Sequence, residues 1–493
     1  MRYLTLLLLC CLLVEPMISR APATARWPRF RGPNGSGVTD TDQPPIQFGP
    51  STKLLWKCAL PPGHSSPIVW DDHIFLTGIE NEKLVVIAVR RRDGNLLWKQ
   101  TVPAAKIESV HPFNSPAAST PATDGQRVYV YAGSYGLLVY DFNGKEMWRQ
   151  PLPLPPTKYG TATSPMTYDG KVILQLDGNN ANSELLAVDG KTGAIVWKTA
   201  RPLMNESWST PMIWSHDGQD ELITVGNGRL VAYSPKDGVE RWWVGGLSYA
   251  PITVAVSGSG LLFTSAKSTG GAPSDPLELP KWETLIESYD RNKDGKLAGA
   301  ELPEEAGIVL RKEVPKETPG NVLPMRQLVG MVDEDKDGLL SKKEWDGLLS
   351  FIASNIDFVL AIRPGGRGDL TRSHVAWKEN RGVSEIPSPI FYRGRLYLIR
   401  DGGMVTSYAP ETGKVILDRQ RLGALGQYVA SPVAADGRIY AASETGMVVV
   451  FRAGDTLEVL ARNELGENIL ATPAIADNKL YIRTNKHLWA FGD

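Results

Sequence analysis

The stretch SPVAADGRIYAASETGMVVVF, residues 431–451, contains the pattern that decides the fold of this 493-residue chain. Apolar residues alternate on both sides of Asp436-Gly437, a dipeptide that suits a tight turn with positive φ, and this predicts a β-hairpin. Gly446 then opens a further apolar strand. The stretch therefore predicts three consecutive strands joined by short turns.

Related units recur along the whole chain. Each begins with Ser, Thr or Ala followed by Pro, and successive starts lie 40 to 54 residues apart, except for one gap of 138 residues. The starting prolines are Pro67, Pro121, Pro165, Pro211, Pro251, Pro389, Pro432 and Pro473. Tryptophans that close a unit are Trp98, Trp148, Trp197, Trp242 and Trp377. Four strands in about 43 residues are typical of one blade of a β-propeller.

Eight starts predict an all-β fold, an eight-bladed β-propeller of four-stranded blades. The last unit, residues 472–491, stops after its third strand, and KLLWKCAL at residues 53–60 has the character of a fourth strand, with Trp56. Together these two segments would complete one blade and leave no open sheet edge. A solenoid or an open sandwich is the alternative, and the regular spacing and matching ends favour the closed ring.

The units, with their DGxxY and GxLxAxDxxTGxxxW patterns, resemble the quinoprotein-like (PQQ-repeat) β-propellers, in which a tryptophan of one blade docks on the next. WPRFRGP at residues 27–33 is similar to the N-terminal opening of bacterial members, and we expect it to anchor on the propeller. The resemblance implies two different functional branches. One comprises pyrroloquinoline-quinone (PQQ) dehydrogenases, and the other comprises non-enzymatic scaffolds of outer-membrane assembly. It therefore predicts the fold better than the function.

The gap between Pro251 and Pro389 indicates an insertion within the fifth blade. LLFTSA (residues 261–266) and FVLAIRP (residues 358–364) read as consecutive strands of that blade, and the residues between them are helical and acidic in character. We expect a signal peptide at 1–25, a first set of blades at 26–266, a helical insertion at 267–357, and further blades at 358–493.

Two twelve-residue strings in this insertion match EF-hand calcium loops. They are DRNKDGKLAGAE, residues 290–301, and DEDKDGLLSKKE, residues 333–344. Calcium takes six to eight oxygen ligands, which an EF-hand loop supplies from positions 1, 3, 5, 7, 9 and 12, with glycine at position 6. The predicted ligands of the first loop are Asp290, Asn292, Asp294, the Lys296 carbonyl, a water beneath Ala298, and Glu301. Those of the second loop are Asp333, Asp335, Asp337, the Leu339 carbonyl, Ser341 and Glu344.

The sequence predicts two Ca²⁺ sites that differ in strength. The second loop offers four carboxylates and the first offers three, so we expect the second to bind more tightly. Apolar residues at helical spacing precede both loops and follow the second, whereas Pro303 and Gly307 interrupt the helix expected after the first. Leu297 and Leu340, at position 8, suit a short pairing between the loops. A structural role for calcium is favoured over a sensing role.

The first residues predict export. Arg2 precedes an apolar run at residues 4–14, and Ala23-Thr24-Ala25 fits a cleavage site. The run is shorter than the about 20 residues that a transmembrane helix needs, so no membrane span is expected after cleavage, and the location is periplasmic or extracellular. Cleavage leaves Cys58 as the only cysteine, without a disulfide partner. A formal charge of −1 gives no basic field for nucleic acid.

The sequence offers no catalytic constellation, so catalytic and cofactor-binding residues stay unassigned. Dehydrogenases of the resembling family use a vicinal cysteine pair, and here the adjacent Cys10 and Cys11 lie in the signal segment. The six histidines show no metal-binding spacing, and no GxSxG or Walker motif occurs. An exported calcium-binding scaffold with a protein or carbohydrate partner on a propeller face is therefore favoured. The alternative is a PQQ-dependent dehydrogenase that oxidises alcohols or sugars.

Overall fold

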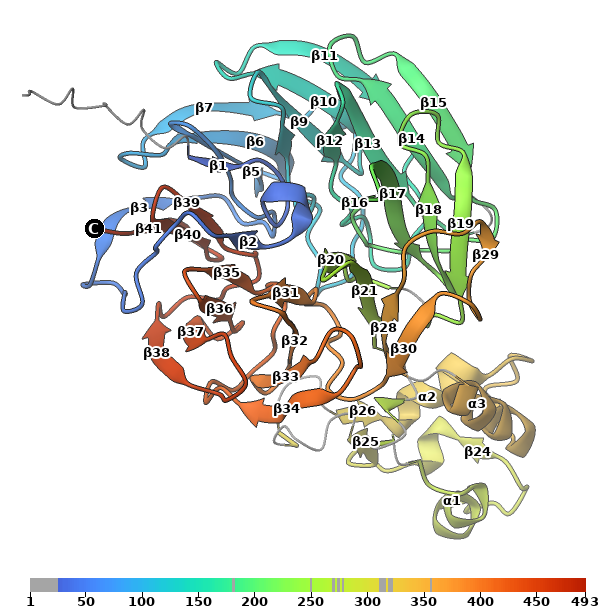
Figure 1. Cartoon of the computed structure of the whole chain (residues 1–493). Coiled ribbons are helices and arrows are strands. Elements are labelled where there is room, and N and C mark those ends of the chain that lie inside the picture. The colour runs from blue at the N-terminus through green and yellow to red at the C-terminus, as the bar shows by residue number, and fades with distance from the viewer. Residues whose placement is uncertain are drawn as a thin grey trace, which may run out of the picture.

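A computed structural model describes residues 25–179, 182–248, 251–267, 271–272, 275–276, 279–309, 316–317, 322–354 and 357–493. The signal peptide predicted for residues 1–25 lies outside this part of the chain except for Ala25. Eight sheets, each built on four antiparallel strands, stand around a common centre as the blades of a propeller (Figure 1), and three of them gain a fifth strand. The predicted fold class is confirmed.

The blades follow one another in chain order, and each runs from an inner to an outer strand. The first four blades are β4 (Ile68–Trp70), β5 (His73–Glu80), β6 (Lys83–Arg90) and β7 (Leu96–Thr101); β8 (Ala122–Thr123), β9 (Arg127–Ala132), β10 (Gly136–Asp141) and β11 (Glu146–Pro151); β12 (Met166–Tyr168), β13 (Lys171–Leu176), β14 (Glu184–Asp189) and β15 (Ile195–Ala200); β16 (Met212–His216), β17 (Gln219–Gly226), β18 (Arg229–Tyr233) and β19 (Glu240–Gly245). The last four are β20 (Val256–Gly258), β21 (Leu261–Ala266), β28 (Phe358–Ile362) and β30 (Val375–Glu379); β31 (Ile390–Tyr392), β32 (Arg395–Arg400), β33 (Met404–Tyr408) and β34 (Val415–Arg421); β35 (Val433–Ala435), β36 (Arg438–Ala442), β37 (Met447–Arg452) and β38 (Val459–Glu464); β39 (Ala474–Ala476), β40 (Lys479–Arg483), β41 (His487–Phe491) and β3 (Leu54–Ala59).

The eighth blade joins the two ends of the chain. Its outer strand β3 pairs antiparallel with β41, from Leu54 opposite Phe491 to Ala59 opposite His487. The middle strands of this blade are buried, and Trp56 and Leu60 of the N-terminal segment belong to the same apolar cluster. Because the last sheet contains strands from both ends, the ring has no gap, as the sequence predicted.

Tryptophans of the outer strands join five of the eight blades to the next blade. The Trp98 indole Nε1 donates to the Phe142 carbonyl at 2.8 Å, and its ring lies over Gly144 of the following blade. A Cβ at Gly144 would lie 2.7 Å from that ring, and the glycine has a φ of +82°, so only glycine fits this turn. The same arrangement joins Trp56 to Gly94, Trp148 to Gly193, Trp197 to Gly238 and Trp377 to Gly413.

Trp242 departs from the docking that the resemblance implied. Its indole donates to Glu221 Oε2 within its own blade, at 2.9 Å. The glycine-rich connection between β28 and β30 contains β29 (Gly368–Asp369), which pairs in parallel with β19, Gly368 opposite Trp242. This connection therefore extends the fourth blade by a fifth strand and takes the place of the turn on which Trp242 would dock.

The Ser or Thr before each starting proline forms a belt of hydrogen bonds between blades. The Ser431 N–H donates to Thr472 Oγ1 at 3.0 Å, and the Thr472 N–H donates to Ser66 Oγ at 3.1 Å, which carries the belt across the closure. Equivalent bonds run from Ser66 to Thr120, Thr120 to Ser164, Ser164 to Thr210, and Ser388 to Ser431. The fifth unit has Ala250 at this position, and there the Val254 N–H donates to Ser388 Oγ. The sequence pattern marked these residues only as unit starts.

We expect Ser431→Ala to lower the free energy of unfolding by about 1–3 kcal/mol, because it leaves the buried Ser388 N–H without its acceptor. Urea denaturation monitored by tryptophan fluorescence measures the change. Ser350→Ala is the matched control, since the Ser350 hydroxyl bonds to the Asp346 carbonyl on an exposed helix surface. Equal midpoints for the two variants would contradict a stabilising belt.

The WPRFRGP stretch anchors on the propeller, as expected, and the N-terminal segment crosses the centre of the ring. β1 (Arg26–Trp27) pairs with β4, η1 (Pro33–Gly35) lies at the middle of the ring, and β2 (Val38–Thr39) pairs with β35 (Figure 1). The buried guanidinium groups of Arg29 and Arg31 donate to the carbonyls of Pro211 and Pro389, at 2.5 and 2.6 Å. The segment thus contacts the first, fourth, sixth and seventh blades.

The insertion projects from the rim beside the fifth blade (Figure 1). β21 and β28, on either side of it, are neighbouring strands, with Ala266 opposite Phe358. It contains β22 (Gly271–Ala272), β23 (Asp275–Pro276), α1 (Trp282–Tyr289), β24 (Leu297–Ala298), η2 (Gly299–Glu301), β25 (Gly307–Val309), β26 (Val322–Pro324), α2 (Met325–Val332), β27 (Leu339–Leu340) and α3 (Lys342–Ser354). Trp282, Leu285, Leu328 and Trp345 form an apolar core of the insertion's own. No helix of the described residues has the length and apolarity needed to cross a bilayer.

Candidate metal centre and propeller pockets

The two predicted loops, loop one (290–301) and loop two (333–344), lie side by side. Asp290 directly follows the last residue of α1, and Asp333 directly follows that of α2. β24 and β27 pair antiparallel, with Leu297 opposite Leu340, which is the pairing expected of position 8. Loop one ends in the short η2 and the chain then forms β25, so the described residues 302–309 contain no helix after Pro303.

In loop one, the first and last carboxylates accept hydrogen bonds from backbone N–H groups of the same loop. Asp290 Oδ1 and Oδ2 accept from the N–H groups of Lys293 and Gly295, at 2.7 and 3.0 Å. Glu301 Oε1 and Oε2 accept from the N–H groups of Arg291 and Ala298, at 3.0 and 2.9 Å. The φ of Gly295 is +79°, as the sharp turn requires.

The side chains at positions 3 and 5 of loop one lie close to each other. Asn292 Nδ2 donates to Asp294 Oδ2 at 2.9 Å, and the Asp294 N–H donates to Asn292 Oδ1 at 2.8 Å. The Lys296 N–H donates to Asp294 Oδ1, also at 2.8 Å. The predicted side-chain ligands of this loop are therefore held by the loop's own hydrogen bonds.

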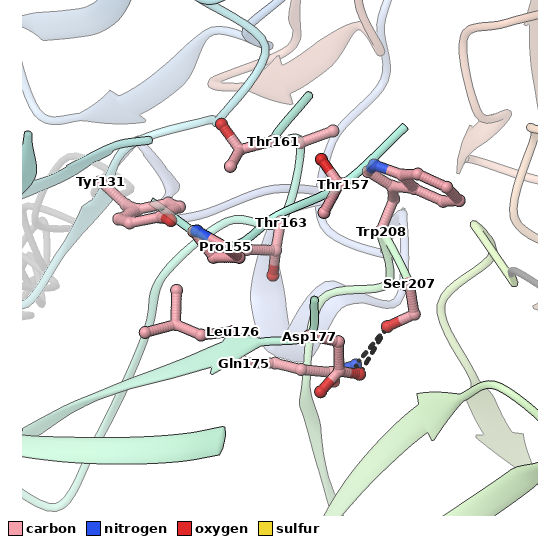
Figure 2. Close-up of a pocket in the computed structure, with 11 residues that line it drawn as sticks. Tyr131, Pro155, Thr157, Thr161, Thr163, Gln175, Leu176, Asp177, Ser207 and Trp208 are labelled. Atoms are coloured by element: carbon pink, nitrogen blue, oxygen red, sulfur yellow. Dashed lines mark hydrogen bonds between the residues drawn. The ribbon is translucent and has the colours of Figure 1, made fainter. Parts of the chain in front are cut away.

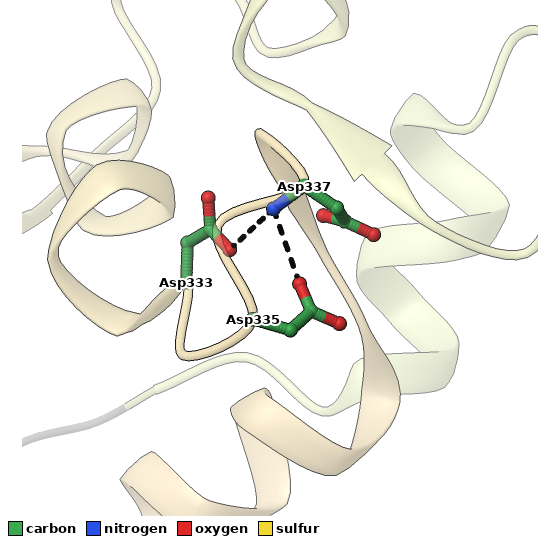
Figure 3. Close-up of side chains that lie close together, drawn as sticks. All are labelled: Asp333, Asp335 and Asp337. Carbon is green, nitrogen blue, oxygen red and sulfur yellow. Dashed lines mark hydrogen bonds between the residues drawn. The ribbon is translucent and has the colours of Figure 1, made fainter.

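Loop two repeats this arrangement with more charge. One carboxylate oxygen each from Asp333, Asp335 and Asp337 lies within 4.8 Å of the other two. The Asp337 N–H donates to Asp333 Oδ1 at 3.1 Å and to Asp335 Oδ1 at 3.2 Å (Figure 3). The Gly338 N–H donates to Asp333 Oδ2, and the Leu339 N–H donates to Asp337 Oδ1. Three carboxylates this close repel one another, and a bound cation removes that repulsion.

Glu344 closes loop two. Its Oε1 accepts from the Glu334 N–H at 2.8 Å, and its Oε2 accepts from the Ser341 N–H and hydroxyl, at 2.8 and 2.7 Å. The Ser341 hydroxyl and these hydrogen bonds hold the pKa of Glu344 below its usual value. The carboxylate is therefore ionised and oriented at neutral pH, as a metal ligand must be.

One side chain connects the two loops. The Lys296 ammonium of loop one forms an ion pair with the Asp337 carboxylate of loop two. Its hydrogen bond lowers the pKa of Asp337 and raises that of Lys296. Only the carbonyl of Lys296 was predicted to take part in metal binding, because a contact between loops depends on their pairing.

A second polar site lies on the propeller between the second, third and fourth blades (Figure 2). The buried Asp177 carboxylate forms a bidentate pair with Arg201, at 2.8 and 3.0 Å, and accepts from Ser207 and Gln175. Tyr131 Oη and Gln175 Oε1 have no partner among the described residues. The pocket volume is about 10 Å³, which is the space for about one water. A carboxylate held this way is not available as a general base.

The described residues lack the vicinal cysteine pair that the resemblance implies for quinone chemistry. Cys58 lies on the outer strand β3, away from any second cysteine of the described part, and burial raises the pKa of its thiol to about 11. Two cavities of the propeller have volumes of about 10 and 60 Å³, and each is too small for a tricyclic quinone.

Eight four-stranded blades, closed by an N-terminal strand and joined by tryptophans, define a quinoprotein-like β-propeller. The chain belongs to the family of outer membrane protein assembly factor BamB, whose model matches residues 82–257 and 365–492, more than half of the chain. The insertion lies between the two matched ranges. No curated protein sequence matches the chain significantly.

Solved structures that share this fold belong to very different proteins. Quinohemoprotein alcohol dehydrogenase from Comamonas testosteroni is 13% identical, with a TM-score of 0.56, over 95% of this chain and 81% of that one. A europium-containing methanol dehydrogenase is 12% identical, with a TM-score of 0.51, over 94% and 89%. The computationally designed Ika8 protein is 10% identical, with a TM-score of 0.51, over 90% and 100%. Likeness at such identities establishes the fold alone.

Proposed function

We propose that this chain is an exported calcium-binding β-propeller that acts as a binding or scaffold module, with two Ca²⁺ ions in its inserted helical pair. The observation that carries the proposal is the repeated geometry of loops one and two. Both begin directly after a helix, both turn at a glycine with a φ of +79°, and they pair through β24 and β27. This geometry supports the assignment of the two loops as an EF-hand pair.

The ligands follow the loop positions. Loop one would bind Ca²⁺ through Asp290, Asn292, Asp294, the Lys296 carbonyl, a water and bidentate Glu301. Loop two would use Asp333, Asp335, Asp337, the Leu339 carbonyl, Ser341 and bidentate Glu344. The hydrogen bonds that already orient the terminal glutamates support these assignments.

A structural role for calcium is part of the proposal. The helices of the insertion pack on one another around Trp345, in a core separate from those of the blades. Without cations, the carboxylates of Asp333, Asp335 and Asp337 face one another across the loop. Calcium would therefore stabilise the packed insertion. Extracellular modules of this type bind Ca²⁺ with dissociation constants of about 10⁻⁴–10⁻³ M, and in calcium-rich surroundings the occupancy of such sites varies little.

The scaffold role is supported by the family, whose description is an outer membrane protein assembly factor. An exported location, periplasmic or extracellular, is consistent with that description and with the N-terminal sequence. We propose a protein partner on a propeller face, with carbohydrate as the second class of partner. Proximity labelling from the intact protein in its exported compartment tests this, and labelling of no recurrent neighbour would contradict it.

The alternative, a PQQ-dependent dehydrogenase, has the fold of the solved alcohol dehydrogenases in its favour. Purification from a quinone-supplied host, followed by an absorption spectrum and a dye-linked assay with alcohols and sugars, separates the two functions. The scaffold proposal predicts neither a quinone absorption band nor dye reduction. A bound chromophore with substrate-dependent dye reduction would overturn it.

The two calcium sites should differ in strength. Loop two offers one more anion than loop one and should be the tighter site. We therefore expect Glu344→Gln to lower the Ca²⁺ affinity of the tighter of two calorimetric binding steps by at least about 10-fold. Glu301→Gln should lower the affinity of the weaker step by at least about 10-fold. Isothermal titration with Ca²⁺ measures both steps. Glu334→Gln is the control, since the Glu334 side chain is at no predicted ligand position. A Glu344→Gln variant that keeps the tighter step and loses the weaker one would contradict the ranking.

The ion pair between Lys296 and Asp337 should weaken the binding of Ca²⁺ to loop two. Lys296→Met removes a cation that contacts the Asp337 carboxylate, so we expect the affinity of loop two for Ca²⁺ to rise about 3-fold or more. Calorimetry at low ionic strength measures the rise, and added salt should reduce it. Lys293→Met, in the same loop but in no described ion pair, is the control. An unchanged or lower affinity in Lys296→Met would contradict the competition.

A further inference from the structure

A second cavity of the propeller lies between the first and eighth blades, where the ring closes. Its volume is about 60 Å³, and its lining includes Pro62, His64, Leu470, Ala471, Arg483 and Asn485. Pro62 and Asn485 are exposed, whereas Arg483 is only 1% exposed. The cavity therefore leads from solvent to a buried cation, and it is far larger than the about 10–15 Å³ that one water requires.

The Arg483 guanidinium has unused hydrogen-bonding capacity. Nη1 donates to the carbonyl and hydroxyl of Ser65, at 3.0 and 2.6 Å, and Nη2 donates to the Pro61 carbonyl at 3.0 Å. A guanidinium carries five N–H groups. The buried Nε has no partner among the described residues, and one N–H of Nη2 is likewise not used by these three bonds.

No carboxylate in the described part of the chain compensates this charge. Arg201 is an equally buried guanidinium in the same propeller, but its charge is compensated, because Asp177 pairs with it through both carboxylate oxygens. Arg483 forms no ion pair within the described residues, and burial alone lowers its pKa to about 9. An isolated buried charge is costly, so buried guanidinium groups are normally paired. Among the buried guanidinium groups without a described carboxylate, only that of Arg483 adjoins a described cavity.

We propose that this cavity binds a short carboxylate anion, of acetate or propionate size, through the guanidinium of Arg483. A guanidinium and a carboxylate match as a planar pair of donors and acceptors. Leu470 and Ala471 give the lining an apolar part that suits a short alkyl group and would not replace the water shell of an inorganic ion.

Charge in the cavity comes from Arg483 alone. Burial and the nearby Arg483 lower the pKa of His64 to about 4, so the imidazole is neutral at pH 7 and serves as a hydrogen-bonding neighbour. The site is independent of the calcium loops, since it lies in the propeller and uses none of their residues.

The test uses the full-length mature protein at constant ionic strength, with sodium acetate exchanged for sodium gluconate, which is too large for the cavity. We expect a saturable rise of about 2 °C in melting temperature with acetate, and broadening of the [1-¹³C]acetate NMR line by the protein. Arg483→Met should lose both effects. Arg452→Met should keep both, because Arg452 is exposed and pairs with Glu458 on the surface.

Three results would overturn the proposal: no saturation in the natural protein, an equal effect of chloride, or an unchanged acetate response in Arg483→Met. If Arg483→Met does not fold, Ala471→Leu decides the question, because it fills the cavity and keeps the guanidinium. Loss of acetate broadening in that variant supports the site, and retention contradicts it.

Discussion

Removing residues 26–60 should abolish cooperative folding of the propeller, whereas removing residues 26–52 should leave a cooperative but less stable ring. The longer deletion takes away β3, so β41 becomes an open edge and the apolar cluster around Trp489 and Phe491 loses its cover. The lost burial of Trp56 and its neighbours alone amounts to about 3–5 kcal/mol, a large fraction of the about 5–15 kcal/mol that stabilises a domain.

The shorter deletion is the matched control for this prediction. It removes β1, η1 and β2, with the contacts of Arg29 and Arg31 at the centre of the ring, but it leaves β3 in the eighth blade. Calorimetry and size-exclusion chromatography distinguish the two variants. A synthetic peptide of residues 53–60 should restore part of the transition when added to the longer deletion. A longer deletion that melts like the shorter one would contradict closure by β3.

Chelation of calcium should lower the melting temperature of the insertion by about 20 °C or more, with little change in the transition of the propeller. At a free Ca²⁺ concentration of 100 times Kd, each site contributes about 2.7 kcal/mol. Two sites therefore contribute about 5 kcal/mol, and a domain of 60–100 residues shifts by about 4–8 °C per kcal/mol. The separate apolar core around Trp282 and Trp345 makes the insertion a unit that can unfold by itself.

Scanning calorimetry at a free Ca²⁺ concentration of about 100 times the calorimetric Kd, and in excess chelator, measures this shift. Circular dichroism at a helical wavelength assigns the transition to the insertion, because the described helices longer than one turn are α1, α2 and α3. A double variant with Glu301→Gln and Glu344→Gln should melt at the chelated temperature in either buffer. An insertion whose melting temperature is the same in calcium and in chelator would contradict a structural role for calcium.

The repeats made the propeller predictable because each blade is a local unit with its own turns and its own apolar alternation. The ring closure was also predictable, since the final unit lacked its fourth strand and the N-terminal segment Leu54–Ala59 has the sequence of such a strand. The candidate metal loops were predictable for the same reason, because the oxygen donors of each loop lie within twelve consecutive residues.

The features that were missed depend on contacts between distant parts of the chain. The Ser and Thr hydroxyls of the belt, such as Thr472 accepting from Ser431, bond only once the blades are neighbours. Trp242 fits the repeat but docks elsewhere, because the glycine-rich connection of the next blade adds β29 to its edge. Arg483 meets Ser65 across the closure of the ring, more than four hundred residues apart in sequence.

The number of calcium ions bound per chain tests the account most directly. The control is a variant in which residues 267–357 are replaced by Asn-Gly, a two-residue turn that joins Ala266 to Phe358, which already face each other in β21 and β28. Isothermal titration of the chelator-stripped proteins should give two Ca²⁺ per natural chain and none for the variant. A natural chain that binds no calcium, or a variant that still binds two, would contradict the account.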